Sequence, residues 1–348
     1  MTETELALFG SLSSVTALIS TPISGFLLDY LGRKYCIIIF SLPQIFAWTL
    51  VIISRRVETV LAARSIAGLG GCLFNLTPVY ISEICHEKIR GTMTEAASAI
   101  AFYRQTKPDS KEVLEEMAMI RKTLNPDTDN EKPGLIQFIK KSKSTRKGLF
   151  IILVLYALSL LQGLVAVQVY AEPVFQAVMP AVSPTVLSVA FAALNIAVGF
   201  VAAYLTDLTG RRPLMIYSSL ATGVCCVLLG SQFQLHWGPH WLSGVFIYSF
   251  CVFYTAGAGT IPYVIVADLF LPEVRSVMTM AAVEWSWVCS FVLLIVFNPL
   301  VEAIGLGGVF YVYAAICFAA SAFSFIYMPE TKGLTVDVIQ TVLMRKKH

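Results

Sequence analysis

Residues 140–170, KKSKSTRKGLFIILVLYALSLLQGLVAVQVY, join five basic residues to an unbroken run of 23 uncharged residues. About 20 consecutive, mostly apolar residues suffice for a helix to cross the hydrocarbon core of a bilayer. A helix satisfies its backbone hydrogen bonds internally, as a lipid-exposed segment must. Because basic residues accumulate on the cytoplasmic side of membrane proteins, the segment predicts a transmembrane helix that starts in the cytoplasm.

The rest of the chain has the same character. It has 348 residues, of which 57% are hydrophobic and only 14% are charged, too little polar surface for a soluble globule of this size. We therefore predict an all-α polytopic membrane protein. About nine transmembrane helices are expected, at residues 7–28, 35–53, 66–84, 149–170, 182–205, 214–229, 241–266, 277–297 and 308–327.

The order of basic residues predicts the orientation of these helices. Thirteen of the 25 Lys and Arg residues lie within residues 88–147, and residues 149–331 contain only Arg211, Arg212 and Arg275. Counting crossings from residue 147 places these three and the basic tail, residues 332–348, on one side, which we expect to be the cytoplasm. Orientation accounts for the net charge of +3, so nucleic acid is not an expected partner.

Two short cassettes occur twice, in the same order. An acid followed by Gly-Arg and a further basic residue lies at residues 29–34 and again at 207–212, a separation of 178 residues. An acid seven residues before an arginine lies at 83–90 and again at 268–275, a separation of 185 residues. Such duplication is typical of a transporter bundle built from two related halves.

Further motifs accompany the cassettes. They are Gly25-x3-Asp29, Arg64-x3-Gly68-x-Gly70, Pro78-Val-Tyr80-x2-Glu83 with Arg90-Gly91, Gly257-x-Gly259-Thr-Ile-Pro262-Tyr, Asp268-Leu-Phe-x-Pro272-x2-Arg275 and Pro329-Glu-Thr-Lys-Gly333. Together they resemble the sugar porter family of the major facilitator superfamily, and within it the insect trehalose or hexose transporters. The resemblance implies facilitated diffusion of a sugar across the plasma membrane by alternating access, without a cofactor.

The chain departs from the family layout of twelve spans in two halves. It begins where the second family span would begin, and after residue 92 it resembles the cytoplasmic domain, so spans one, five and six are expected to be absent. The expected parts of this incomplete bundle are an N-terminal remnant, 1–91, a cytoplasmic helical linker, 92–148, a six-helix half, 149–331, and a cytoplasmic tail, 332–348. A transport-incompetent truncated isoform or fragment is the alternative to a working transporter.

The cassettes supply candidate gating salt bridges. By itself, a Gly-Arg-basic turn at a membrane surface also fits a simple topology anchor. Acids at neighbouring helix ends favour ion pairs that break and re-form as the halves rock, and the resemblance implies that such pairs lock the outward-facing state. The candidates are Asp29, Arg33, Glu83, Arg90, Asp207, Arg211, Arg212, Asp268 and Arg275.

Candidate sugar-binding residues lie inside the spans. The family's seventh span carries a Gln-Gln pair and an Asn, where this chain has Ser159-Leu160 and Val165, so Gln162 and Gln168 are the available substitutes. The resemblance implies that Asn195 binds sugar and that Tyr263 stands where the family has a sugar-stacking tryptophan. Glu284 stands where the family has Asn, just before Trp285. These candidates are Gln162, Gln168, Asn195, Tyr263, Glu284 and Trp285.

Glu284 is unusual because it lies near the bilayer centre. At about 1.5 Å per residue, it is roughly 13 Å beyond Arg275. A carboxyl at that depth indicates function. It either stays neutral and donates a hydrogen bond, or it exchanges protons during transport; the alternative is that the site has decayed.

No intramembrane His/Asp, Ser/Lys or HExxH set occurs, so an enzyme and a metal site are not expected. The sugar and the oligomeric state stay open.

Overall fold

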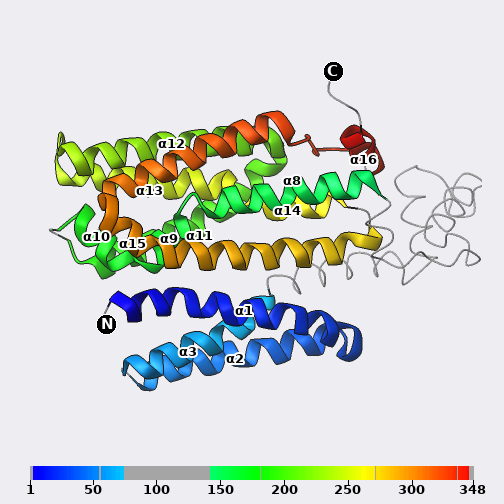
Figure 1. The fold of residues 1–348 in the computed structure, drawn as a ribbon, viewed down its shortest axis with the longest axis horizontal. Coiled ribbons are helices and arrows are strands. Elements are labelled where there is room, and N and C mark those ends of the chain that lie inside the picture. The colour runs from blue at the N-terminus through cyan, green and yellow to red at the C-terminus, as the bar shows by residue number, and fades with distance from the viewer. Residues whose placement is uncertain are drawn as a thin grey trace, which may run out of the picture. The chain divides into compact units, whose positions relative to one another are not determined.

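The computed structural model describes residues 3–54, 56–73, 142–180, 182–270, 272–334 and 336–344, and all its elements there are helices (Figure 1). These residues belong to one compact unit that combines residues 1–73 with residues 142–348. The predicted all-α fold is therefore confirmed.

The N-terminal helices are α1 (Glu3–Leu31), α2 (Arg33–Ile53) and α3 (Val57–Leu69), and the 3₁₀ turn η1 (Gly70–Cys72) follows. Gly32 separates α1 from α2, with φ of 77° and ψ of 163°. Only glycine adopts this backbone region readily. The chain therefore reverses between two antiparallel helices at this glycine.

The same turn occurs in the second copy of the cassette. Gly210 separates α11 (Pro184–Thr209) from α12 (Arg211–Leu235), with φ of 94° and ψ of 160°. The two copies thus share a backbone conformation as well as a sequence pattern. This agreement supports the internal repeat predicted from the cassettes.

The third predicted span, 66–84, has a wrong start. Helix α3 begins at Val57, nine residues earlier, and residues 74–84 lie outside the described residues. Helix α3 therefore includes Arg64, which lies before the predicted start. In the structure the Arg64 guanidinium lies 5.0 Å from the centre of the Phe9 ring, a contact that offsets part of the cost of burying it.

The remaining helices follow residue 142. They are α8 (Lys143–Leu160), α9 (Leu164–Val169), α10 (Ala171–Val178), α11, α12, α13 (His240–Phe253), the π-helix η2 (Tyr254–Ala258), α14 (Ile261–Leu269), α15 (Pro272–Tyr327) and α16 (Val336–Met344). Helix α8 begins at Lys143, within the range expected for the linker, and the Ser142 hydroxyl caps it by accepting from the Thr145 N–H.

Six helical stretches within the described residues are long and apolar enough to cross a membrane. The last, Val277–Tyr327, has 51 residues, about twice the length that a bilayer requires. It bends at Gly305, where φ is 72°, so it supplies both of the last two predicted spans. Helix α1 covers the first predicted span with 29 residues, although it is not among the six.

Glycines allow the helices of the C-terminal half to pack closely. A Cβ at Gly230 of α12 would lie 2.9 Å from the Gly307 carbonyl oxygen of α15, and a Cβ at Gly307 would lie 3.0 Å from the Gly230 oxygen. Small residues let helix backbones approach in this way in membranes. On α11, by contrast, Ile196, Phe200 and Tyr204 are exposed at four-residue spacing, as expected for a lipid-facing side.

Candidate functional site

The first predicted span of the C-terminal half is interrupted at residues 161–163. Helix α8 ends at Leu160 and α9 begins at Leu164, with Gly163 between them at φ of 97°. A Cβ at Gly163 would lie 2.3 Å from the Tyr313 ring. Glycine is therefore required at this break, both for the backbone conformation and for space.

Gln162 lies at this break and is fully buried. Its Nε2 donates to the Ser219 hydroxyl of α12 over 3.4 Å, and its Oε1 has no hydrogen-bond partner among the described residues. Buried polar atoms are nearly always hydrogen-bonded, so an unpartnered one requires an explanation. An amide oxygen at a helix break is able to accept from a substrate hydroxyl.

A second break lies in the span of α13 and α14. The α-helix changes to the π-helix η2 at Tyr254, and α14 starts at Ile261, with Pro262 in its first turn. This break coincides with the Gly257-x-Gly259-Thr-Ile-Pro262 motif. A Cβ at Gly257 would lie 2.2 Å from the Ser218 hydroxyl oxygen, so this glycine also lets η2 approach α12.

The two broken spans are in direct contact. The Ser159 hydroxyl, in the last turn of α8, donates to the Ala258 carbonyl of η2. Its oxygen also lies 3.4 Å from the Tyr254 hydroxyl. Carbonyls and N–H groups freed by a helix break are where transporter sites commonly form, and here two breaks share one hydrogen-bonded cluster.

Two further candidates join the second break. Thr255 of η2 donates to the Asn195 side-chain oxygen of α11 over 2.7 Å. The Tyr263 ring of α14 meets the Tyr156 ring of α8 edge to face, with centroids 5.1 Å apart, and the Tyr263 side chain is 46% exposed. Asn195 and Tyr263 are therefore attached to the same pair of broken spans as Gln162.

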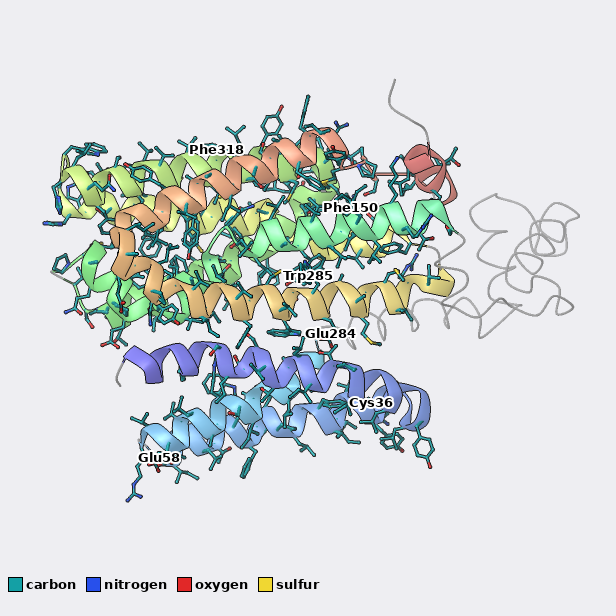
Figure 2. The ribbon with its side chains drawn as sticks, in the orientation of Figure 1. Cys36, Glu58, Phe150, Glu284, Trp285 and Phe318 are labelled. Carbon is teal, nitrogen blue, oxygen red and sulfur yellow. The ribbon has the colours of Figure 1, made fainter. Side chains whose placement is uncertain are left out.

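The structure does not place the other sugar-site candidates in these contacts. Gln168 is exposed. The Trp285 indole N–H donates to the Leu153 carbonyl of α8 over 3.0 Å, which leaves its partly exposed ring face available. Glu284 lies on the side of α15 toward α1, near the Thr21 hydroxyl (Figure 2).

Sequence reasoning missed the hydroxyl partners of these candidates. They are Ser159, Ser219, Tyr254 and Thr255. Tyr254 and Thr255 directly precede the Gly257 motif, so proximity to the break could have indicated them. Ser219 lies within an unbroken helix, and its spacing carries no comparable signal.

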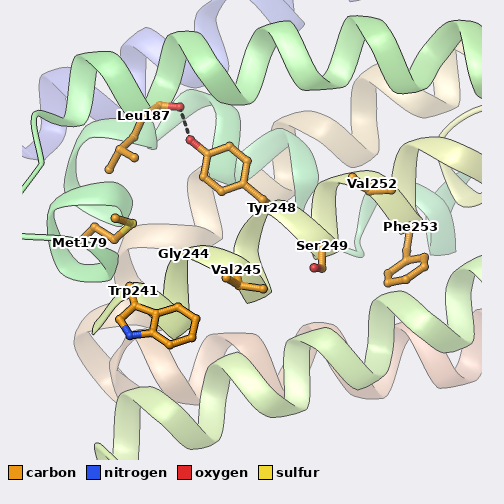
Figure 3. A pocket seen from close by; sticks show the side chains of 9 residues that line it. All are labelled: Met179, Leu187, Trp241, Gly244, Val245, Tyr248, Ser249, Val252 and Phe253. Carbon is orange, nitrogen blue, oxygen red and sulfur yellow. Dashed lines mark hydrogen bonds between the residues drawn. The ribbon is translucent and has the colours of Figure 1, made fainter. Parts of the chain in front are cut away.

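A pocket lies at a different place in the structure. A groove of about 560 Å³ is bordered by Met179 of the α10 end, Leu187 of α11 and Trp241 to Phe253 of α13 (Figure 3). Its lining is mostly apolar, and the Tyr248 hydroxyl already donates to the Leu187 carbonyl over 2.9 Å. Because sugars require several free donors and acceptors, this groove is unsuited to a sugar.

Some of the predicted gating residues form a cluster at the helix ends that the sequence predicts to be cytoplasmic. Arg211 Nε lies 3.2 Å from Asp268 Oδ2, and the two side chains are 17% and 28% exposed. The Thr331 hydroxyl donates to the same Asp268 oxygen over 2.9 Å. The cluster therefore joins the start of α12, the end of α14 and the chain segment after α15.

Glu330 belongs to this cluster but was not among the predicted site residues. Its Oε1 and Oε2 accept from the backbone N–H groups of Arg211 and Arg212, each over 3.1 Å. The carboxylate therefore caps the N-terminus of α12, where free N–H groups and the helix dipole favour a negative charge. The signal was in the Pro329-Glu330-Thr331 motif, which sequence reasoning used only for family resemblance.

The remaining gating candidates either bond to backbone carbonyls or lie outside what the structure describes. Arg212 Nη2 donates to the Phe325 carbonyl, and Arg275 Nη2 donates to the Phe270 carbonyl over 3.5 Å. Glu83 and Arg90 lie outside the described residues, as do the side chains of Asp29, Arg33 and Asp207. The ion pairs predicted for these five residues stay predictions.

Comparison with known families shows where the chain belongs. The family described as "Sugar (and other) transporter" matches residues 2–98 and 93–343. The chain is a member of this sugar transporter family. The match extends over both expected halves, so the chain is a membrane transporter of this family and not an enzyme.

Similar curated proteins are insect transporters. The chain is 24% identical over 403 residues to the facilitated trehalose transporter Tret1 of Bombyx mori, covering 99% of this chain and 80% of that protein. It is 25% identical over 411 residues to Tret1 of Polypedilum vanderplanki, with the same coverage. This coverage is consistent with a chain shorter than its relatives, and the comparisons do not favour the transport-incompetent alternative.

Solved structures show the same fold. A proton:xylose symporter of the major facilitator superfamily, XylE, matches with a TM-score of 0.69 at 17% identity, covering 97% of this chain and 89% of that chain. An inward-open conformation of XylE from E. coli matches with a TM-score of 0.68. The major facilitator fold predicted from the sequence is therefore confirmed.

Proposed function

We propose that this chain carries trehalose or a hexose across the plasma membrane by facilitated diffusion, with residues 92–148 and the C-terminus in the cytoplasm. The single observation that supports a sugar site in this chain is the contact between two broken spans, with the Gln162 amide oxygen unpartnered beside it. The names of the insect relatives support the choice of sugar.

The proposed site uses the polar groups at the two breaks. Gln162 Oε1 accepts from a sugar hydroxyl, and Asn195 offers its amide N–H₂, since its side-chain oxygen already accepts from Thr255. The half-exposed Tyr263 ring and the ring face of Trp285 provide apolar surfaces for the C–H face of a sugar. Gln168 is exposed and is not part of this arrangement.

The cytoplasmic cluster supplies the proposed gate. The Arg211–Asp268 pair and the Glu330 cap tie α12, α14 and the segment after α15 together. Opening of the site toward the cytoplasm separates these elements. A few such contacts supply the small free-energy difference that keeps the outward-facing state populated.

Uptake of labelled trehalose and glucose into transport-deficient cells tests the proposal, with surface display of the 348-residue chain verified. We expect saturable uptake of at least one sugar. Gln162→Leu should lower sugar uptake at least tenfold, because the hydrogen bond from the sugar to Gln162 is lost. Leaving a buried hydrogen-bonding group unpaired costs about 1–3 kcal/mol.

Gln168→Leu is the matched control. It is the same substitution in the same span at an exposed position, and it should leave uptake within about twofold of the unmodified chain. Absence of uptake at normal surface levels would contradict the proposed function. Equal losses for the two variants would contradict the proposed site.

A further inference from the structure

Glu284 is an intramembrane carboxyl that the proposed sugar site does not use. It lies nine residues beyond Arg275 in α15, on the side toward α1 (Figure 2). At about 1.5 Å per residue this depth is roughly 13 Å, near the middle of the hydrocarbon core. Ionisable residues at this depth are costly and usually functional.

Within the described ranges, the surroundings of Glu284 leave part of its carboxyl without a hydrogen-bond partner. Its Oε1 is buried without a hydrogen-bond partner among the described residues. The nearby hydroxyl of Thr21 in α1 donates its only proton to the Ala17 carbonyl over 2.8 Å. With this proton on Ala17, the Thr21 oxygen presents lone pairs that accept from a carboxylic acid, whereas a carboxylate accepts from Thr21 only if that proton leaves Ala17.

The charged and titratable groups of the neighbouring helices make other contacts, although the Arg64 Nε has no hydrogen-bond partner among the described residues. Arg64 of α3 lies over Phe9, twelve residues before Thr21 on α1. Tyr156 of α8 and Tyr263 of α14 contact each other, and Lys147 of α8 donates to Leu343 over 2.8 Å. Among the described residues, no hydrogen bond or ion pair joins a cation to Glu284.

An ionised carboxylate is poorly tolerated under these conditions. Without a cation at this depth, and with the Thr21 proton on the Ala17 carbonyl, the charge carries a desolvation cost of several kcal/mol. The carboxylic acid avoids that cost and gains a hydrogen bond to Thr21. Because α1 and α15 come from different halves of the repeat, the bond also joins two parts that move relative to each other in alternating access.

We propose that Glu284 is a proton-binding site at the contact between α1 and α15, and that its protonated form is the one that supports sugar exchange. The proposal rests on the proposed sugar transport. When Glu284 is protonated, its O–H donates to the Thr21 oxygen and the two helices pack together. Loss of the proton places a charge against lone pairs and weakens the contact, so exchange slows as pH rises.

Labelling with an apolar carbodiimide tests the proton-binding site directly. Such reagents modify protonated carboxyls in apolar surroundings, and mass spectrometry of the purified full chain in lipid nanodiscs locates the adduct. We expect labelling of Glu284 that declines as pH rises, while Glu302, exposed on the same helix, is not labelled. Labelling of Glu302 without Glu284, or labelling of Glu284 that pH does not change, would overturn the proposal.

Exchange of labelled sugar at equal concentrations across proteoliposomes tests the link to transport. The unmodified chain should slow at least threefold between pH 6 and pH 8.5, whereas Glu284→Gln, which keeps a donor at every pH, should exchange at a pH-independent rate. Thr21→Val should slow exchange, and Thr21→Ser, which keeps the acceptor, should restore it.

The two proposals fail in different ways. If the unmodified chain exchanges sugar at a rate that pH does not change, the inference about Glu284 is overturned and the proposed function stands. If no sugar is exchanged at any pH, the proposed function fails, and the carbodiimide result still decides whether Glu284 binds a proton.

Discussion

Gly163 illustrates how a single residue sets up the candidate site. It is the last of the three residues that separate α8 from α9, and its φ is positive. The nearby Tyr313 ring leaves no room for a side chain. Gly163→Ala should therefore destabilise the chain by about 1–3 kcal/mol from backbone strain, with the ring clash in addition. Thermal unfolding in detergent measures this as a lower midpoint, accompanied by a loss of sugar uptake.

Gly199→Ala is the matched control, the same substitution at a glycine inside a helix. Gly199 lies inside α11, and nothing comes within 4 Å of a Cβ built there. The same substitution should leave the midpoint unchanged or slightly raised, because alanine is the better helix former. Equal losses for the two variants would show that the break at Gly163 tolerates a side chain.

Among the helices, α12 depends on a group supplied by a distant part of the chain. The Glu330 carboxylate accepts from two N–H groups of its first turn, which have no acceptor within the helix. Glu330→Gln removes the charge and one acceptor, so we expect a loss of about 1–2 kcal/mol in unfolding free energy.

The unfolding midpoint of the purified variant checks this expectation. Glu302→Gln, the same change at an exposed position of α15, serves as control and should shift the midpoint by much less. A midpoint for Glu330→Gln that coincides with the control would show that the cap contributes nothing to stability.

For the molecule as a whole, the cluster of Arg211, Asp268 and Glu330, which we propose to lie on the cytoplasmic side, should bias the two transport states. The Arg211–Asp268 pair is partly exposed, and such pairs are worth about 0–1 kcal/mol. Arg211→Gln should therefore shift the population toward the inward-facing state by up to about fivefold. An impermeant maleimide added on the cytoplasmic side should react faster with a cysteine introduced at Tyr263.

Arg146→Gln controls for a general loss of cytoplasmic charge, since Arg146 is exposed at the start of α8. It should leave the maleimide rates on both sides unchanged. Rates that Arg211→Gln does not alter on either side would remove the proposed gating role of the ion pair.

Pattern-based predictions worked where one physical requirement dominates. Long apolar runs predicted helices correctly because lipid leaves the backbone no other open structure. The start of the third span was wrong, because α3 extends further toward the N-terminus and includes Arg64, which has an aromatic partner inside the bundle. Gln168 was a reasonable candidate by composition, yet its position on the helix exposes it.

Composition, charge order and the repeated cassettes were enough to predict the membrane helices and the turn glycines at Gly32 and Gly210, since these depend on local chemistry. The family was predicted from the resemblance of the motifs to those of known transporters. The partners of the functional side chains required the tertiary structure. Gln162 meets Ser219 and Asn195 meets Thr255 across 57 and 60 residues, and Glu330 reaches Arg211 across 119. Such contacts depend on how each helix is rotated and where it breaks, and sequence spacing contains neither quantity.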